Sequence, residues 1–237
     1  MERHLELIAK SYDNHFAEYG KEDAPSYDNL PDYIINNPDY NKYKTELESS
    51  GTGGEGSGCK KIEDYLMPAK DMNFIDLGCC LNLMSKGYDK WLSIYHGVDI
   101  SAETIGLLNN FVAENNVSVG SLYLGSIHET PFIDSYFDIG ACIGVLEYFE
   151  KDFVEKAIIE AHRIIKAGGK FALDIPNIES PTGRVMMLIE EYLGRPCKFN
   201  MTSHEFEDLI QKYFDIIETS GAATGKMAIE YYLHCKK

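Results

Sequence analysis

Short apolar segments alternate with helical segments over most of the chain, and this alternation constrains the fold more than any other feature. Apolar runs of strand length occupy residues 73–77, 94–100, 117–124, 137–143 and 170–175. Helical patterns fill intervals between them, at 101–115 and 152–166. Parallel neighbouring strands need crossover connections of this kind, and the crossovers wind in one hand. The pattern therefore predicts an α/β protein with a mostly parallel, doubly wound sheet.

Capping residues and the tail complete the predicted fold. Ser101 is expected to cap the first of these helices. Gly168-Gly169 are expected to stop the second at residue 166, as a left-handed C-cap does. The tail holds a helix that closes with residues 206–213 and strands at 214–220 and 227–234. The connection between these two strands is short enough to join only antiparallel neighbours. The whole pattern predicts a Rossmann-like, seven-stranded sheet with an antiparallel last strand.

The amino-terminal region has a different pattern. Apolar side chains recur there at the spacings of three and four that mark an amphipathic helix, at Leu5, Ile8, Tyr12, Phe16 and Tyr19. A flexible Gly/Ser-rich stretch follows at 49–58. We therefore expect an amino-terminal helical cap with its linker at residues 1–58 and a core domain at 59–237. Residues 175–203, longer than a plain connection, are expected to be an insertion that covers the substrate.

Composition restricts the function classes. The chain has 22 Lys plus Arg against 38 Asp plus Glu, a formal charge of −16. Nucleic-acid binding depends on neutralising phosphates with Lys and Arg, so we expect no nucleic-acid partner. The acidity serves solubility, or it attracts a cationic or amine substrate.

The location of the protein follows from its cysteines and apolar runs. The six cysteines form no C-x-x-C pair. No signal peptide pattern occurs at the amino terminus, and the apolar run at 139–149 is too short to span a bilayer. We expect a cytoplasmic protein with reduced thiols that does not bind a membrane.

Polar residues and glycines gather where the first strands end. In open α/β sheets, ligands bind beyond these carboxyl ends. Gly78 allows a sharp turn after the first strand, and Asp99, at the end of the second, has the place of a carboxylate that binds ribose hydroxyls. After the third strand, Ser126 and Ile127 are placed to meet an adenine edge. A helix-start carboxylate favoured by the macrodipole is the alternative interpretation of Asp99.

Four motifs in order resemble the class I S-adenosylmethionine-dependent methyltransferases over residues 62–237. They read NFIDLG at the first strand, YHGVDIS at the second, ETPFIDSYFDIGACIGVLEYF around the fourth, and AHRIIKAGGKFAL before the fifth. The antiparallel last strands also fit this family. The resemblance implies S-adenosylmethionine as cofactor. It implies cofactor contacts by Asp76, Gly78, Cys80, Asp99, Ile100, Ser126, Ile127, Cys142 and Ile143, and by Tyr19 from a helix folded over the cofactor.

The chain departs from the family pattern in its glycine loop. Cys80 and Asn82 stand at the second and third glycine positions of G-x-G-x-G, and Ser126 stands where Asp is common. Asn tolerates left-handed backbone comparatively well. Cys80 places a Cβ where the cofactor approaches.

Methyl transfer from a sulfonium needs alignment and, for an O- or N-nucleophile, sometimes a base. Glu147 and His128 are the candidate catalytic residues. Arg184, in the 175–203 insertion, is either a surface residue or the partner of an anionic substrate.

The sequence predicts methyl transfer to a small-molecule acceptor and leaves the acceptor and the oligomeric state open. A ligand-binding protein that keeps the fold without turnover is the first alternative. A nicotinamide-dependent oxidoreductase is the second, but it needs a G-x-G-x-x-G loop that this chain lacks.

Overall fold

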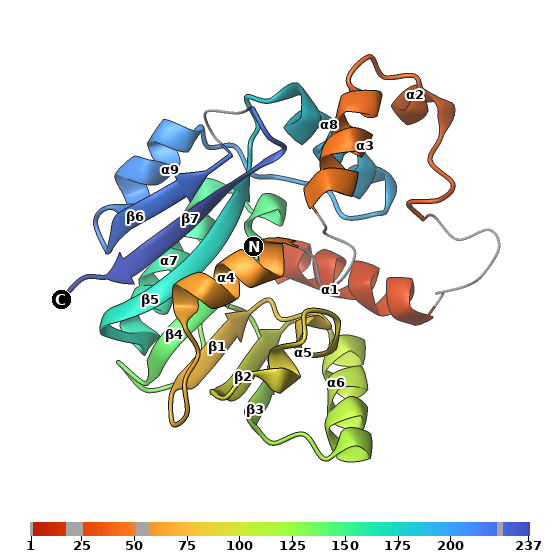
Figure 1. Ribbon diagram of the computed structural model, residues 1–237. Coiled ribbons are helices and arrows are strands. Elements are labelled where there is room, and N and C mark those ends of the chain that lie inside the picture. The colour runs from red at the N-terminus through yellow and green to blue at the C-terminus, as the bar shows by residue number, and fades with distance from the viewer. Residues whose placement is uncertain (1, 18–25, 51–56, 222–224) are drawn as a thin grey trace.

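The computed structural model describes residues 2–17, 26–50, 57–221 and 225–237 (Figure 1). Its strands form one seven-stranded sheet in the order β3-β2-β1-β4-β5-β7-β6. The strands are β1 (Asn73–Leu77), β2 (Ile94–Asp99), β3 (Val119–Leu124), β4 (Phe137–Cys142), β5 (Ile165–Pro176), β6 (Phe214–Ser220) and β7 (Ala228–Cys235). The pairs from β3 to β5 are parallel, and β7 runs antiparallel to both β5 and β6. The predicted doubly wound sheet with an antiparallel last strand is confirmed.

Helices cover both faces of the sheet. They are α1 (Glu2–Ala17), α2 (Asp32–Ile35), α3 (Tyr40–Ser50), α4 (Ser57–Leu66), α5 (Asn82–Ser85), α6 (Ala102–Asn115), α7 (Lys151–Ile164), α8 (Pro181–Tyr192) and α9 (Ser203–Ile210). Two single 3₁₀ turns are η1 (Tyr88–Lys90) and η2 (Leu146–Tyr148).

Alternation along the strands creates two hydrophobic cores. Successive side chains of a strand point to opposite faces. Ile75 of β1 and Leu173 of β5 pack with α7 and α9, whereas their neighbours Phe74 and Ala172 pack with α4 and α6. This alternation of apolar side chains on both faces explains why the strands read as nearly continuous apolar runs in the sequence.

Most predicted boundaries agree with the structure to within two residues. Strand β1 spans the predicted 73–77 and β6 the predicted 214–220. Ser101 caps α6, and its Oγ accepts a 3.0 Å hydrogen bond from the Thr104 N–H. Helix α9, predicted to close with 206–213, ends at Ile210 and is followed by a turn.

The predicted glycine stop after α7 is wrong. The helix ends at Ile164, and Ile165 already has extended backbone and pairs with Phe137 as the first residue of β5. The buried side chain of Ile165 and its strand pairing end the helix without a glycine cap. Gly168 has a φ of +77° inside β5, where the register with β4 shifts. The two glycines therefore absorb an irregularity in the strand.

The amino-terminal helices lie beside the sheet. Figure 1 shows α1 next to α6, and α2 and α3 next to α8. Ile34 of α2 and Tyr43 of α3 form a separate small core with Val185 and Ile189 of α8. Helix α3 ends at Ser50 and α4 begins at Ser57, so the centre of the Gly/Ser-rich stretch lies outside the described residues. The domain boundary at residue 58 stays a prediction.

Strand β2 carries a buried histidine opposite β3. His96 is 5% exposed and is surrounded edge-on by Phe132, Tyr136 and Phe137. Its Nδ1 lies 2.8 Å from the Ser121 Oγ, and its Nε2 has no partner within the described chain. Burial lowers the pKa of His96 to about 4, because the charged ring is poorly solvated there.

We predict that His96 makes stability depend on pH. Its pKa is lower in the folded than in the unfolded chain, so its contribution is complete above about pH 6.5 and is lost as pH falls toward 4. His96→Phe should reduce the loss of unfolding free energy between pH 7 and pH 5 by roughly 1–2 kcal/mol. Urea denaturation at both pH values measures this. The exposed His204 gives the control, since His204→Gln should leave the pH dependence unchanged. An unaltered pH dependence in His96→Phe would contradict the assignment.

Candidate functional site

The turn after β1 can be built only with glycine at residue 78. Gly78 has a φ of +74°, which disfavours any side chain. A Cβ there would stand 2.3 Å from Val145 Cγ2. The N–H groups of Gly78 and Cys79 both donate to the Val98 carbonyl, at 2.8 and 2.9 Å, which folds the turn back onto β2.

Asp99 joins this turn to the end of β2. Its carboxylate accepts a 2.8 Å hydrogen bond from the Cys80 N–H and a 2.9 Å bond from the Ser101 N–H. Burial raises the pKa of Asp99, and these N–H donors oppose the rise by stabilising the charged form. The carboxylate thus lies at the start of α6 and also lines the cavity described below. A helix-start carboxylate and a ribose-binding carboxylate are therefore compatible interpretations of Asp99.

The two substituted glycine positions have different backbones. Cys80 has a φ of +40° and takes the left-handed conformation, whereas Asn82 is the first residue of α5 and has no positive φ. The left-handed tolerance of Asn is therefore not used at residue 82. Its side chain has another role, because Asn82 Nδ2 donates to the Asp76 carboxylate at 3.2 Å.

Asp76 lies beneath the turn. Its side chain is fully buried, and its Oδ2 also accepts a 2.9 Å bond from the Tyr95 hydroxyl. Its Oδ1 has no partner within the described chain. Burial raises the pKa of Asp76 to about 7, and the two donors limit that rise. Asp76 does not line the cavity.

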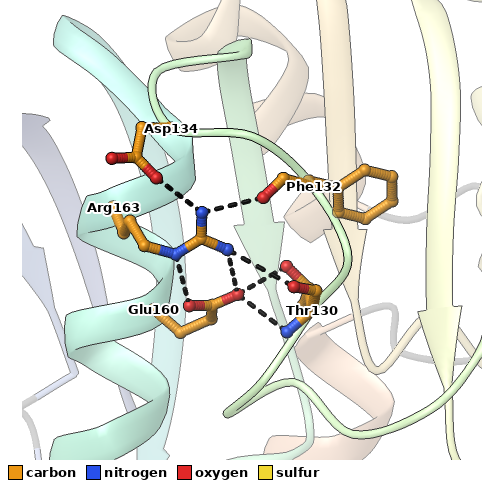
Figure 2. Close-up of polar contacts among 5 residues, drawn as sticks. All are labelled: Thr130, Phe132, Asp134, Glu160 and Arg163. Atoms are coloured by element: carbon orange, nitrogen blue, oxygen red, sulfur yellow. Dashed lines mark hydrogen bonds and ion pairs between the residues drawn. The ribbon is translucent and has the colours of Figure 1, made fainter.

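The loop between β3 and β4 is fixed from α7. Arg163 donates to both carboxylate oxygens of Glu160 and to the Phe132 carbonyl and the Asp134 carboxylate (Figure 2). Glu160 in turn accepts from the N–H and the hydroxyl of Thr130, at 2.7 and 2.5 Å. Because Thr130 follows closely after residues 126–128, this ion pair holds the loop that carries the predicted adenine contacts.

Within that loop, Ser126 and His128 contact each other. The Ser126 Oγ lies 2.6 Å from His128 Nδ1, and the His128 ring packs on Phe153. Burial lowers the pKa of His128. Ser126 lines the cavity and His128 stands behind it.

Helix α1 covers the carboxyl ends of the strands. At one end, His4 Nε2 donates to the Tyr148 carbonyl at 2.6 Å. At the other end, the Asp13 carboxylate accepts from the Ser101 hydroxyl at 2.6 Å and from the Glu103 N–H at 3.2 Å. Asp13 therefore adds a second anionic group at the N-terminus of α6, where the helix dipole favours negative charge.

A cavity lies between α1 and the strand ends. Seven of the predicted cofactor residues line it: Gly78, Cys80, Asp99, Ile100, Ser126, Ile127 and Ile143. Eight further residues complete the wall: Leu5, Ile8, Tyr12, Gly144, Val145, Tyr148, Phe149 and Phe153. Most of these eight residues had no predicted role in the site. The apolar stripe of α1 was visible in the sequence, but nothing there told which face it would cover.

The remaining predicted residues lie elsewhere. Cys142 is buried in β4 below the cavity, and Tyr19 lies outside the described residues. Glu147 is 9% exposed beside the cavity, and its Oε1 is 3.8 Å from where a Cβ on Gly144 would stand. Burial raises the pKa of Glu147 to about 8, and the neighbouring Asp174 carboxyl adds to the rise. Glu147 is thus a proton-holding group next to the cavity at neutral pH.

Two classes of site find no support in the described ranges. No group of three or more His, Cys, Asp or Glu side chains there is placed to hold a metal ion. No described helix is both long enough and apolar enough to cross a bilayer.

Residues 75–173 match the family model of a methyltransferase domain. These residues contain the end of β1, the Gly78 turn, Asp99 and the Ser126 loop, which together form the floor of the cavity. This match covers less than half of the chain, in the part that forms the floor of the cavity.

Solved structures of methyltransferases and of other proteins share the fold of the chain. Geranyl diphosphate C-methyltransferase from Streptomyces coelicolor A3(2), solved with Mg²⁺, geranyl diphosphate and S-adenosyl-L-homocysteine, has a TM-score of 0.68 at 14% identity, covering 98% of each chain. The PH0226 protein of Pyrococcus horikoshii OT3 has a TM-score of 0.63 at 18% identity, covering 88% of this chain and 100% of its own. No curated protein matches the sequence.

We predict that the Arg163–Glu160 pair stabilises the fold. Arg163→Met should lower the free energy of unfolding by about 1–3 kcal/mol, because it leaves the Glu160 carboxylate and the Phe132 carbonyl short of donors. Lys60→Met is the matched control. It breaks an exposed ion pair with Asp64 and should leave the free energy of unfolding nearly unchanged, because solvent screens such a pair. Urea denaturation measures both, and equal effects would show that the loop is held by other contacts.

Proposed function

We propose that the cavity binds S-adenosylmethionine and that the chain transfers its methyl group to a small-molecule acceptor. The observation that carries the proposal is the joint placement of Gly78, Asp99 and Ser126 around one cavity beneath α1.

The residues present fit the cofactor. At Gly78 the backbone is bare, and any Cβ would fill the turn. Asp99 accepts one N–H bond at each oxygen and keeps lone pairs for ribose hydroxyls. Ile100, Ile127 and Ile143 supply apolar contacts for the adenine and the sulfonium end.

The bound cofactor supplies an activated methyl group, so the protein's part is alignment and exclusion of water. Helix α1 closes the cavity with Leu5, Ile8 and Tyr12. Glu147 lies beside Gly144. Its carboxylate would take the proton that the methyl acceptor loses during the transfer. His128 is the second candidate base, and its Nδ1 is engaged with Ser126.

The small-molecule acceptor is supported by the apolar side chains that line much of the cavity and by the similar structure that holds geranyl diphosphate. The formal charge of −16 supports the proposal that no nucleic acid is the acceptor. The free cysteines among the described residues support the proposal that the protein works in the cytoplasm. Binding without turnover is the second candidate, because Cys80 adds a side chain to the cavity wall at a glycine position.

Calorimetric titration with S-adenosyl-L-homocysteine tests the cofactor assignment. We expect micromolar binding and no binding of NAD. Asp99→Ala should weaken binding by roughly 1.5–3 kcal/mol, about 10- to 150-fold, because a charge-assisted hydrogen bond is lost. Asp64→Ala, on the exposed side of α4, is the control and should bind as the wild type does. An unchanged dissociation constant for S-adenosyl-L-homocysteine in Asp99→Ala would contradict the assignment of Asp99 as a cofactor contact.

The pH dependence of turnover tests Glu147. Its raised pKa keeps the carboxyl protonated below about pH 8, so a base at this position acts only as pH rises toward and past that value. Initial rates of S-adenosyl-L-homocysteine release, followed with an accepted substrate, should therefore increase up to about pH 8.

Glu147→Gln should abolish this pH dependence and lower kcat by roughly 10²-fold. The dissociation constant of S-adenosyl-L-homocysteine should stay within twofold. A wild-type rate in Glu147→Gln would exclude Glu147 as the base. Cofactor binding without release for any acceptor would favour the non-catalytic candidate.

A further inference from the structure

A buried arginine lies next to the cavity with part of its guanidinium unused. Arg195 follows α8 and is only 4% exposed. Its Nε donates to Glu190 Oε2 at 2.7 Å, and its Nη2 contacts the Tyr27 hydroxyl at 3.1 Å. Its Nη1 makes no hydrogen bond within the described residues. Buried arginines normally use their donors, so a free Nη1 in a nearly buried side chain needs an explanation.

Tyrosines from three separate segments fix the position of this arginine. The Tyr27 and Tyr148 hydroxyls donate to the two oxygens of Glu190, at 2.6 and 3.0 Å. Because Tyr148 uses its proton for Glu190, Tyr12 is the donor in the 3.1 Å contact between the Tyr12 and Tyr148 hydroxyls. The Tyr12 ring lies 5.0 Å from the guanidinium carbon of Arg195. The network therefore holds the arginine rigidly from α1, η2 and α8.

This network adjoins the cavity. Tyr12 and Tyr148 line the cavity with one side and contact the Glu190–Arg195 pair with the other. Burial raises the pKa of the Cys80 thiol and the Glu147 carboxyl, and the Arg195 charge opposes both rises. The guanidinium thus lies within electrostatic reach of the groups around the cavity.

The surroundings of Arg195 suit an anion. Glu190 accepts hydrogen bonds from Arg195, Tyr27 and Tyr148, and its charge is paired with that of Arg195. Glu147 is mostly protonated at neutral pH and does not repel a negative group. A planar guanidinium is also the side chain best suited to carboxylates and phosphates.

We propose that Arg195 binds the anionic head group, a carboxylate or a phosphate ester, of the methyl acceptor. The proposal rests on the proposed function, because it names the acceptor class for the same cavity. The apolar wall of the cavity then receives the remainder of the acceptor, and Arg195 sets specificity without taking part in the methyl transfer.

A set of probes that differ only in head group tests this. Octanoate, octyl phosphate, octan-1-ol and octylamine are titrated calorimetrically into the full-length chain, with and without saturating S-adenosyl-L-homocysteine. We expect at least one anion to bind at least tenfold more tightly than the alcohol and the amine. The comparison of octanoate with octyl phosphate then tells which anion is preferred. Equal binding of all four probes, tightest binding of octylamine, or no measurable binding of either anion overturns the proposal.

Variants locate the effect. Arg195→Met should lower the affinity for the preferred anion at least tenfold and leave octan-1-ol within twofold. Arg184 is the matched control, because it is exposed and donates only to the carbonyls of Ile178 and Glu179. Arg184→Met should keep the preference for the anion. An unchanged preference in Arg195→Met, or its loss in Arg184→Met, overturns the assignment.

Two controls separate the head-group preference from effects on folding and on cofactor binding. If Arg195→Met does not fold, Arg195→Lys replaces it, keeps the charge and should keep part of the preference for the anion. The order in which the wild type binds the four probes then still supports or overturns the proposal. Binding of S-adenosyl-L-homocysteine is measured on the same preparations. Its absence in the wild type contradicts the proposed function, whereas its presence without a head-group preference contradicts only the role of Arg195.

Discussion

The arrangement of the site depends on the hydrogen bonds that the Asp99 carboxylate accepts. It accepts from the Cys80 N–H and the Ser101 N–H, and so joins the turn after β1, the end of β2 and the start of α6. The Val98 carbonyl reinforces the junction by accepting from Gly78 and Cys79. Since β1 and β2 are parallel neighbours, both connections leave the same edge of the sheet, and this pair of contacts sets the floor of the cavity.

The roof depends on the same junction. Asp13 of α1 accepts from the hydroxyl of Ser101, whose N–H donates to Asp99. At the other side, α1 is held through Tyr12 to Tyr148 and onward to the Glu190–Arg195 pair. A buried ion pair contributes little net stability, because desolvation opposes its Coulomb energy. The pair acts instead as a fixed polar anchor for segments that are distant in sequence.

The sequence predicted the sheet and the floor of the site because both depend on local patterns. Strand β1 reads as an apolar run that ends at a glycine, and Asp99 stands where the second strand ends. The roof depends on tertiary contacts that no local pattern records. The stripe of Ile8 and Tyr12 predicts a helix, but not the surface that it covers. The end of α7 was misplaced for a similar reason, because the pairing of Ile165 with Phe137 outweighs the glycine signal three residues later. Arg195 gave no signal, since a single arginine after a helix is usually a surface residue.

The most direct test of the central claim is a crystal structure of the chain with S-adenosyl-L-homocysteine. The account predicts the ligand beneath α1, with both ribose hydroxyls within about 3.2 Å of the Asp99 carboxylate and the sulfur facing Gly144. Asp99 should keep its bonds to the Cys80 and Ser101 N–H groups. A ligand bound elsewhere, or a ribose held by residues other than Asp99, would contradict it.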